Sequence, residues 1–151
     1  MPYTIFDQGS PQPYRLAVYL VDDSVTDREL AVEAFEDGAG RVEVTPFPDG
    51  PSVLGALRTP GVTLPDVILL DLNMPTMTGF QVLAALKDDP TLSVIPVVMM
   101  TSSADEGDVR RAYSLHANSY IIKAVDFTQF VQQLDTFVTY WQSVRRPRFT
   151  R

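Results

Sequence analysis

Acidic, hydroxyl and ammonium side chains stand where apolar, strand-forming runs of the sequence end. Asp22 and Asp23 follow the first of these runs, and Asp71 ends the third. Thr101 and Lys123 follow the fourth and fifth. Carboxylates crowded together repel one another, and one of them takes up a proton unless a cation intervenes. A hard divalent ion such as Mg²⁺, which prefers carboxylates, waters and phosphate oxygens, suits this set.

The other polar groups of the set indicate phosphoryl transfer. The ammonium group of Lys123 can pair with a phosphoryl oxygen, and the hydroxyl group of Thr101 can donate a hydrogen bond. Phosphoryl transfer needs mainly positioning and neutralisation of charge, and aspartate is a known phosphoryl-accepting nucleophile. Asp71 ends the run Val67-Ile68-Leu69-Leu70, which is apolar at every position. We therefore expect the chemistry to be organised around Asp71.

These side chains meet only if the strands that carry them lie in one parallel sheet. Apolar runs predict strands over residues 16–21, 42–47, 66–71, 94–100 and 119–122. Apolar spacing and capping residues predict helices over about 24–38, 51–57, 80–89, 105–115 and 126–143. Such β-α alternation is typical of a parallel sheet with helices on both faces. The carboxyl ends of its strands then meet at one edge, where α/β proteins place their chemistry.

Single residues refine this prediction. Pro46 indicates that the strand over 42–47 lies at an edge of the sheet, and Ser24 or Thr26 can cap the helix that follows the first strand. Tyr113 is expected to face inward. The last helix is long enough for its end, with Trp141, to extend beyond the sheet.

The composition excludes several classes of protein. The chain has 151 residues, of which 45% are hydrophobic, enough for one domain with a proper core. A net charge of −7 argues against a nucleic-acid surface. The lack of cysteine excludes disulfides and thiolate metal sites. No apolar run is long enough to span a bilayer and no signal peptide is recognisable, so we expect a cytoplasmic protein.

Taken in order on matching strand ends, the polar residues resemble the receiver domain of two-component response regulators. The motifs are Asp22-Asp23, Asp71-Leu72-Asn73-Met74-Pro75 with Gly79, Thr101-Ser102 and Lys123. The receiver domain is expected over residues 14–144, after an arm or flexible tail over 1–13 and before a basic, frayed tail over 145–151. The resemblance implies a flavodoxin-like (βα)5 fold with strand order 2-1-3-4-5.

The resemblance also implies roles for the matching residues. Asp71 matches the phosphoacceptor. Asp22 and Asp23 match the acidic pair that holds Mg²⁺, with Asp71 and the backbone carbonyl of Asn73 as the other protein ligands. Lys123 matches the lysine that bridges the acidic site and the phosphate.

Two further positions match the signalling switch of the family, and one departs from its pattern. Thr101 matches the switch hydroxyl that moves toward the phosphoryl group, and Tyr120 matches the aromatic that turns inward on activation. Response regulators usually have proline after the lysine, often with a cis peptide bond, whereas here Ala124 follows Lys123. A cis bond without proline costs about 2.5–4 kcal/mol, so we expect either a trans bond with an altered loop or a strained cis bond.

The stretch over 120–127 and the aromatic last helix are similar to the stand-alone response regulators of bacterial phytochromes. This narrower resemblance implies a sensor histidine kinase as partner, with a bacteriophytochrome as the candidate. It also implies a homodimer through the helix over 105–115, the strand over 119–122, the last helix and the C-terminal segment. We expect a phosphoacceptor signalling protein, not an enzyme, that works through protein contacts and without DNA binding, because the sequence ends soon after the last helix.

Two alternatives stay open from the sequence. A Mg²⁺-dependent phosphohydrolase with an aspartyl-phosphate intermediate commonly has a second acid two residues after its nucleophile, and here that residue is Asn73. A pseudo-receiver, an interaction module that is never phosphorylated, is supported only by Ala124. The intact acidic set argues against it.

Overall fold

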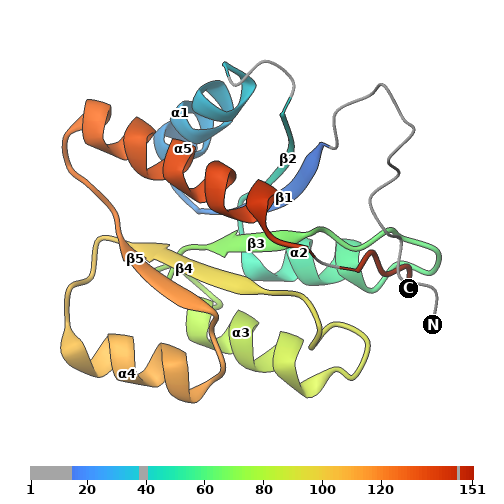
Figure 1. Ribbon diagram of the computed structural model, residues 1–151. Coiled ribbons are helices and arrows are strands. Elements are labelled where there is room, and N and C mark those ends of the chain that lie inside the picture. Colours follow the sequence, from blue (N-terminus) through green and yellow to red (C-terminus); the bar gives the residue numbers. More distant parts are fainter. Residues whose placement is uncertain (1–14, 38–40, 146) are drawn as a thin grey trace.

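The structure, a computed structural model, describes residues 15–37, 41–145 and 147–151, and within them five parallel strands form one sheet (Figure 1). The strands are β1 (Leu16–Val21), β2 (Val42–Phe47), β3 (Val67–Leu70), β4 (Val97–Thr101) and β5 (Ser119–Ile122). Their order is β2-β1-β3-β4-β5, which confirms the order that the resemblance implied. β2 lies at an edge, as Pro46 predicted. The expected arm over 1–13 and the expected helix end at Gly38 lie outside the described residues.

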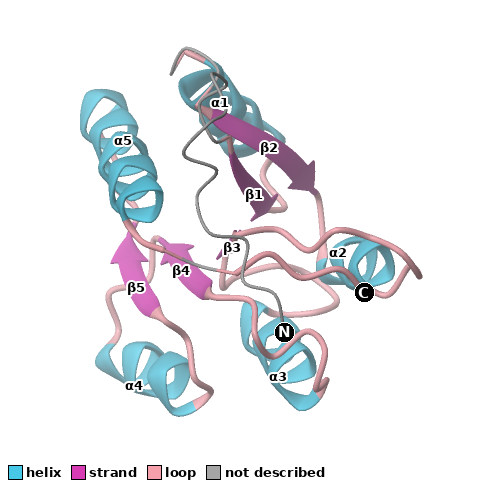
Figure 2. Cartoon of the chain, turned by 45° about the vertical axis from the view of Figure 1, so that its right-hand side comes forward, coloured by secondary structure: helices cyan, strands magenta, loops and turns pink. Residues whose placement is uncertain are grey.

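Helices cover both faces of the sheet (Figure 1, Figure 2). They are α1 (Val25–Glu36), α2 (Gly50–Leu57), α3 (Gly79–Asp88), α4 (Glu106–Ser114) and α5 (Phe127–Ser143). α1 and α5 pack against each other on one face, and α2, α3 and α4 cover the other face. The arrangement is the doubly wound architecture that the β-α alternation predicted.

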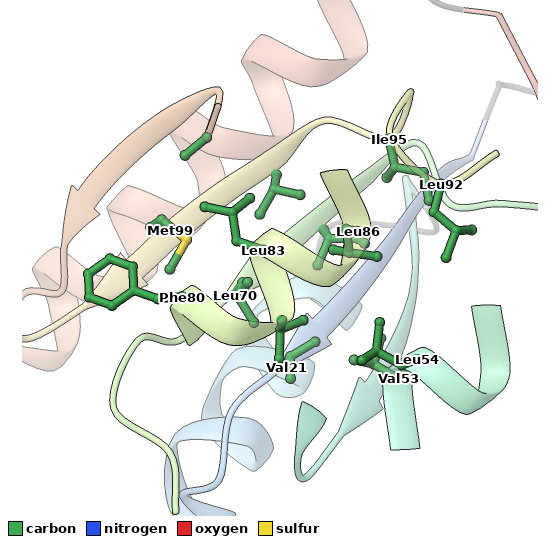
Figure 3. Close-up of a cluster of buried hydrophobic side chains, with 14 of the residues drawn as sticks. Val21, Val53, Leu54, Leu70, Phe80, Leu83, Leu86, Leu92, Ile95 and Met99 are labelled. Atoms are coloured by element: carbon green, nitrogen blue, oxygen red, sulfur yellow. The ribbon is translucent and has the colours of Figure 1, made fainter. Parts of the chain in front are cut away.

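The central strand β3 is buried on both sides, as its apolar run predicted. Ile68 and Leu70 belong to the hydrophobic cluster beneath α2 and α3, whereas Val67 and Leu69 belong to the cluster beneath α1 and α5. Figure 3 shows the first cluster, to which Leu70 of β3 and Leu83 of α3 both belong. Close packing on both faces leaves β3 little freedom to move, so the residue that follows it is held firmly.

Capping side chains fix where two of the helices near the strand ends begin. Ser24, and not Thr26, caps α1, because its hydroxyl oxygen accepts the backbone N–H of Asp27 at 3.2 Å. At α3, the Thr78 oxygen accepts the N–H of Gln81, and the Gln81 side chain accepts the N–H of Thr78 at 2.9 Å. These caps satisfy backbone groups that the helix leaves unpaired and bring both first turns next to the carboxyl edge of the sheet.

Two predictions about helix faces are wrong. Trp141 does not extend beyond the sheet: its side chain is 6% exposed, and its ring lies 6.4 Å from that of Phe137 and 5.3 Å from that of Tyr140. Tyr113 of α4 is 49% exposed, and Ala112 is the residue that α4 buries.

In the described part of the chain, no helix combines the length and apolarity needed to cross a membrane. The cytoplasmic location stays a prediction.

The C-terminal segment, residues 147–151, packs against the rest of the domain. The expectation that it is frayed is therefore wrong. It forms an antiparallel bridge and backbone hydrogen bonds with residues 61–64. Phe149 packs against the cluster beneath α2 and α3, and Arg151 pairs with Asp89 at 3.3 Å. Residues 61–64 precede β3, so this contact lies at the amino edge of the sheet, opposite the edge where Asp71 follows β3.

Candidate functional site

The carboxyl ends of β1 and β3 bring three carboxylates together, as predicted. Val21 pairs with Leu70 in the parallel register, so the residues that follow them are neighbours. Ligand oxygens of Asp22, Asp23 and Asp71 all lie within 4.8 Å of one another. The side chains of Asp22 and Asp71 are buried and that of Asp23 is exposed. The cluster is therefore open to solvent on the side of Asp23.

Asp71 is held by backbone contacts from both sides. Its N–H donates to the carbonyl of Val21 at 2.9 Å, and its side chain accepts the N–H of Leu72 at 2.8 Å. The N–H of Gly79, at the start of α3, donates to the Leu72 carbonyl at 2.8 Å. A Cβ atom at Gly79 would overlap the carbonyl oxygen of Asp71, so glycine is required for this close approach.

The electrostatics of the cluster favour a cation. Burial raises the pKa of Asp71 to about 6, and the charges of Asp22 and Asp23 add to the rise. The positive charge of Lys123 and the N–H of Leu72 oppose it. A hard divalent cation would relieve this repulsion, and three neighbouring carboxylate oxygens are a donor set that Mg²⁺ accepts. The residues therefore fit the predicted metal.

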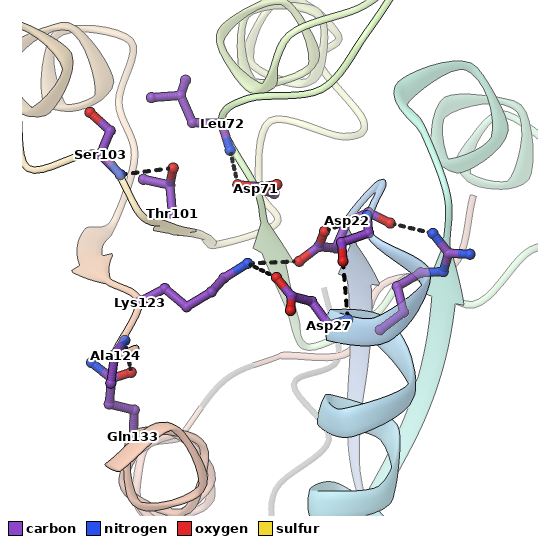
Figure 4. A network of polar contacts seen from close by, with 11 residues as sticks. Asp22, Asp27, Asp71, Leu72, Thr101, Ser103, Lys123, Ala124 and Gln133 are labelled. Atoms are coloured by element: carbon purple, nitrogen blue, oxygen red, sulfur yellow. Dashed lines mark hydrogen bonds and ion pairs between the residues drawn. The ribbon is translucent and has the colours of Figure 1, made fainter. Parts of the chain in front are cut away.

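Lys123, at the end of β5, reaches across the site to α1 (Figure 4). Its ammonium group donates to Asp22 and to Asp27, each at 2.9 Å. Burial lowers the pKa of Lys123, but the hydrogen bonds that it donates to Asp27 and Asp22 and the charges of Asp22 and Asp71 outweigh burial, so the pKa is raised. The lysine is therefore charged at neutral pH. Among the ion pairs of the described residues, Lys123 has Asp22 and Asp27 as partners and not Asp71.

Thr101 and Tyr120, the predicted switch residues, are connected through Ser103. Thr101 is fully buried at the end of β4, and its hydroxyl oxygen accepts the N–H of Ser103 at 3.3 Å. The Tyr120 hydroxyl donates to the Ser103 carbonyl at 2.9 Å, and the Ser103 hydroxyl donates to Asp108 of α4 at 2.6 Å. A movement of Thr101 therefore has a hydrogen-bonded route to Tyr120 and α4.

The loop after Lys123 is built without proline. The Lys123–Ala124 peptide bond is trans, which confirms the first of the two expected forms. The N–H of Ala124 donates to the Gln133 side chain at 2.9 Å, and Gln133 donates back to the Ile122 carbonyl at 2.8 Å. Proline has no N–H and could not make the first of these bonds. Gln133 thus fixes the loop that carries Lys123.

Sequence reasoning placed the main residues correctly and missed those that hold them. Asp22, Asp23, Asp71, Thr101 and Lys123 all lie at the carboxyl edge of the sheet, as predicted. Asn73 follows two residues after Asp71 with an exposed side chain, and its role as a carbonyl ligand stays a prediction. Asp27, in the first turn of α1, was not among the predicted site residues. Its position four residues after Asp23 was the available signal, since that turn faces the site.

Fold and site together define a parallel α/β protein with a cluster of three carboxylates and a lysine at the carboxyl edge of its sheet. The family described as "Response regulator receiver domain" matches residues 18–135. The chain therefore belongs to the response regulator receiver family, whose members are signalling proteins.

Individual relatives agree with this assignment over most of their length. The probable methanogenesis regulatory protein FilR2 of Methanothrix harundinacea is 38% identical over 82% of this chain and 82% of its own. The response regulator Rcp1 of Synechocystis is 34% identical over 89% of this chain and 92% of its own. The crystal structure of the phosphorylated cyanobacterial phytochrome response regulator RcpA is 36% identical, with a TM-score of 0.82 over 89% of this chain and 99% of RcpA.

Proposed function

We propose that the protein accepts a phosphoryl group on Asp71 from a histidine kinase in a Mg²⁺-dependent reaction. The observation that carries the proposal is the cluster of Asp22, Asp23 and Asp71, whose ligand oxygens lie within 4.8 Å of one another beside Lys123. Asp22, Asp23, Asp71 and the backbone carbonyl of Asn73 would hold the metal. Bound Mg²⁺ supplies charge neutralisation for the phosphoryl oxygens.

In the proposed phosphoryl transfer, Asp71 is the nucleophile, and Lys123 and Thr101 stabilise the phosphoryl group. A carboxylate oxygen of Asp71 attacks the phosphorus atom of a phosphohistidine, the P–N bond breaks, and the imidazole leaves and takes a proton from water. Asp71 must be ionised to attack, and with a pKa of about 6 it is ionised at neutral pH. Lys123 and the Thr101 hydroxyl stabilise the phosphoryl oxygens. Hydrolysis of the acyl phosphate by water later returns the carboxylate and inorganic phosphate.

Phosphorylation would then bias the connected switch residues. Thr101 moves its hydroxyl toward the phosphoryl group, and the hydrogen bonds through Ser103 transmit that movement to Tyr120 and α4. The face formed by α4, β5 and α5 changes shape for partners that read it. We propose protein contacts, and not DNA, as the output, since the chain carries a net charge of −7.

Structures similar to this chain support the proposed divalent metal ion and the proposed upstream kinase. The structure of Rcp1 similar to this chain, with a TM-score of 0.79 and 32% identity over 87% of this chain and 98% of Rcp1, is a Mn²⁺-bound form. RcpA, in its phosphorylated form, is a phytochrome response regulator. We therefore propose a phytochrome-type histidine kinase as the upstream partner.

We also propose that the protein is a homodimer through the face of α4, β5 and α5. Large apolar side chains are about half exposed or more on this face: Tyr113, Ile122, Val125, Phe127 and Tyr140. Exposed apolar side chains favour a partner surface of the same kind. The C-terminal segment, which was expected to join the interface, packs against residues 61–64 of its own chain. The proposed dimer therefore depends on the face of α4, β5 and α5 alone.

Phosphorylation with a small acyl-phosphate donor and Mg²⁺, followed by intact mass, tests the proposed reaction. We expect the native protein to gain one phosphoryl group, and Asp71→Asn to gain none. Asp88→Asn, at the exposed end of α3, is the matched control and should behave as the native protein. No gain in a folded protein that binds Mg²⁺, with the donor or with a purified kinase, would instead identify a pseudo-receiver. Steady turnover of small phosphate esters would identify a phosphohydrolase.

A further inference from the structure

The ammonium group of Lys123 is shared between two carboxylates that belong to different parts of the site. Asp22 is one of the three clustered carboxylates, whereas Asp27 lies outside the cluster in the first turn of α1. Both donor–acceptor distances are 2.9 Å. The side chain of Lys123 is 14% exposed and that of Asp27 is 38% exposed, so solvent screens this pair only in part.

The local backbone places Asp27 at this point. Ser24 caps α1 by accepting the N–H of Asp27, and Arg28 donates to the backbone carbonyl of Asp22 at 2.7 Å. The first turn of α1 is therefore tied to the end of β1. As Figure 4 shows, Asp27 and Asp22 approach the ammonium group of Lys123 from neighbouring positions. The pairing thus follows from the helix start and is not an accident of a flexible surface side chain.

Asp22 cannot serve the lysine and a metal ion equally well. One of its oxygens accepts the N–H of Ser24 at 2.9 Å, and the other accepts Lys123. A divalent cation at the cluster needs an oxygen of Asp22, and the ammonium charge beside it opposes the binding. Asp27 offers Lys123 a second partner and neutralises its charge without entering the cluster.

We propose that Asp27 is a positioning residue that holds the Lys123 ammonium group on the α1 side of the site and so frees Asp22 for the metal ion. This inference rests on the proposed function, because it assigns Asp27 a part in the Mg²⁺-dependent phosphorylation of Asp71. Asp27 contacts Lys123 and does not touch the phosphoryl group.

Replacing Asp27 has two consequences of opposite direction. In Asp27→Asn, Asp22 is the one charged partner left among those that the structure gives Lys123, and a negative charge near the cluster is lost, so Mg²⁺ binds more weakly. Once the metal is saturating, however, the lysine is no longer held by a competing carboxylate and reaches the incoming phosphoryl group more readily. Phosphorylation at saturating Mg²⁺ therefore becomes faster. A purely structural role for Asp27 would not produce this combination.

The experiment measures Mg²⁺ binding by calorimetry and phosphorylation by a small acyl-phosphate donor on the full chain. For Asp27→Asn we expect a dissociation constant for Mg²⁺ about three- to tenfold higher than that of the native protein, together with a higher phosphorylation rate at saturating Mg²⁺. Asp27→Glu keeps the charge and should restore metal binding. Glu29→Gln, an exposed acid of the same helix, is the matched control and should leave both quantities unchanged.

The outcomes separate this inference from the proposed function. Unchanged or tighter Mg²⁺ binding in Asp27→Asn, an equal loss in Glu29→Gln, or slower phosphorylation at saturating Mg²⁺ would each overturn the role of Asp27. Circular dichroism of each variant shows that the comparison is made between folded proteins. A native protein that binds Mg²⁺ but accepts no phosphoryl group would contradict the proposed function, while the calorimetric comparison would still report on Asp27.

Discussion

The Asp71 carboxylate is costly to bury without a cation beside it. Its pKa is raised from 3.8 to about 6, first by burial and then by Asp22. Between these two values the folded state binds more protons than the unfolded state, so Asp71 makes the metal-free protein less stable as the pH rises through that window. Above about pH 6 the cost is complete, on the order of 2–3 kcal/mol.

Asp71→Asn removes this titration and should be more stable than the native protein without metal at pH 7. Chemical denaturation in a chelator at several pH values measures the difference in the free energy of unfolding. We expect the difference to be small near pH 4 and to grow until about pH 6, by on the order of 2–3 kcal/mol. Asp49→Asn should behave in the opposite way. Hydrogen bonds from Ser52 lower the pKa of Asp49, so its stabilising contribution is present at neutral pH and is lost at low pH.

Individual site residues were predictable from sequence where a strand end determines their place. Asp22 and Asp71 each follow a buried strand and Lys123 follows the partly buried β5, and parallel register then brings the strand ends together. Asp27 and Gln133 could not be found in this way. They act across the site from helices, and which side of a helix faces a strand end depends on packing that apolar spacing leaves undetermined.

At the scale of elements, the described strands and helices follow the predicted order along the chain. The differences concern which side chains of the helices are buried. The end of α5 was expected to extend beyond the sheet because length alone suggested it. Instead Trp141 is buried in the cluster beneath α1 and α5, with its ring near those of Phe137 and Tyr140. Tyr113 fits the helical period of α4, but Ala112 already fills the contact with the sheet. The spacing of apolar residues predicts which side of a helix is buried, but not how far around or along the helix the buried side extends.

The C-terminal segment is an element that sequence reasoning interpreted as a frayed tail. Phe149 contributes to the cluster beneath α2 and α3, and residues 61–64 supply the backbone partners. Phe149→Ala should lower the free energy of unfolding by about 1–2 kcal/mol, less than for a fully buried phenylalanine, because the side chain is half-buried. Urea denaturation measures the loss. Thr150→Ala, which keeps the bridging backbone and changes only an exposed side chain, should have little effect. Equal stability of Phe149→Ala and the native protein would show that the segment is not docked in solution.

At the scale of the whole molecule, the fold separates three regions. The acidic cluster occupies the carboxyl edge of the sheet, and the C-terminal segment occupies the amino edge. The apolar face of α4, β5 and α5 lies to one side of both. Ser103 connects Thr101, at the carboxyl edge of the sheet, to Tyr120 of β5 and Asp108 of α4. Under the proposed function, movement of Thr101 on phosphorylation of Asp71 would reach a partner on this face through Ser103.

The dimer proposed for this face has a clear test by light scattering coupled to gel filtration at micromolar concentration. We expect the native protein to be a dimer and the double variant Val125→Asp/Phe127→Asp to be a monomer, because two charges would enter an apolar interface and weaken it by at least about tenfold. Folding should survive, since Val125 is fully exposed and Phe127 begins α5, where an acid is favourable. Val25→Asp, at an exposed apolar position that begins α1, is the matched control and should remain dimeric. A native protein that is monomeric before and after phosphorylation would show that the apolar face serves a different partner.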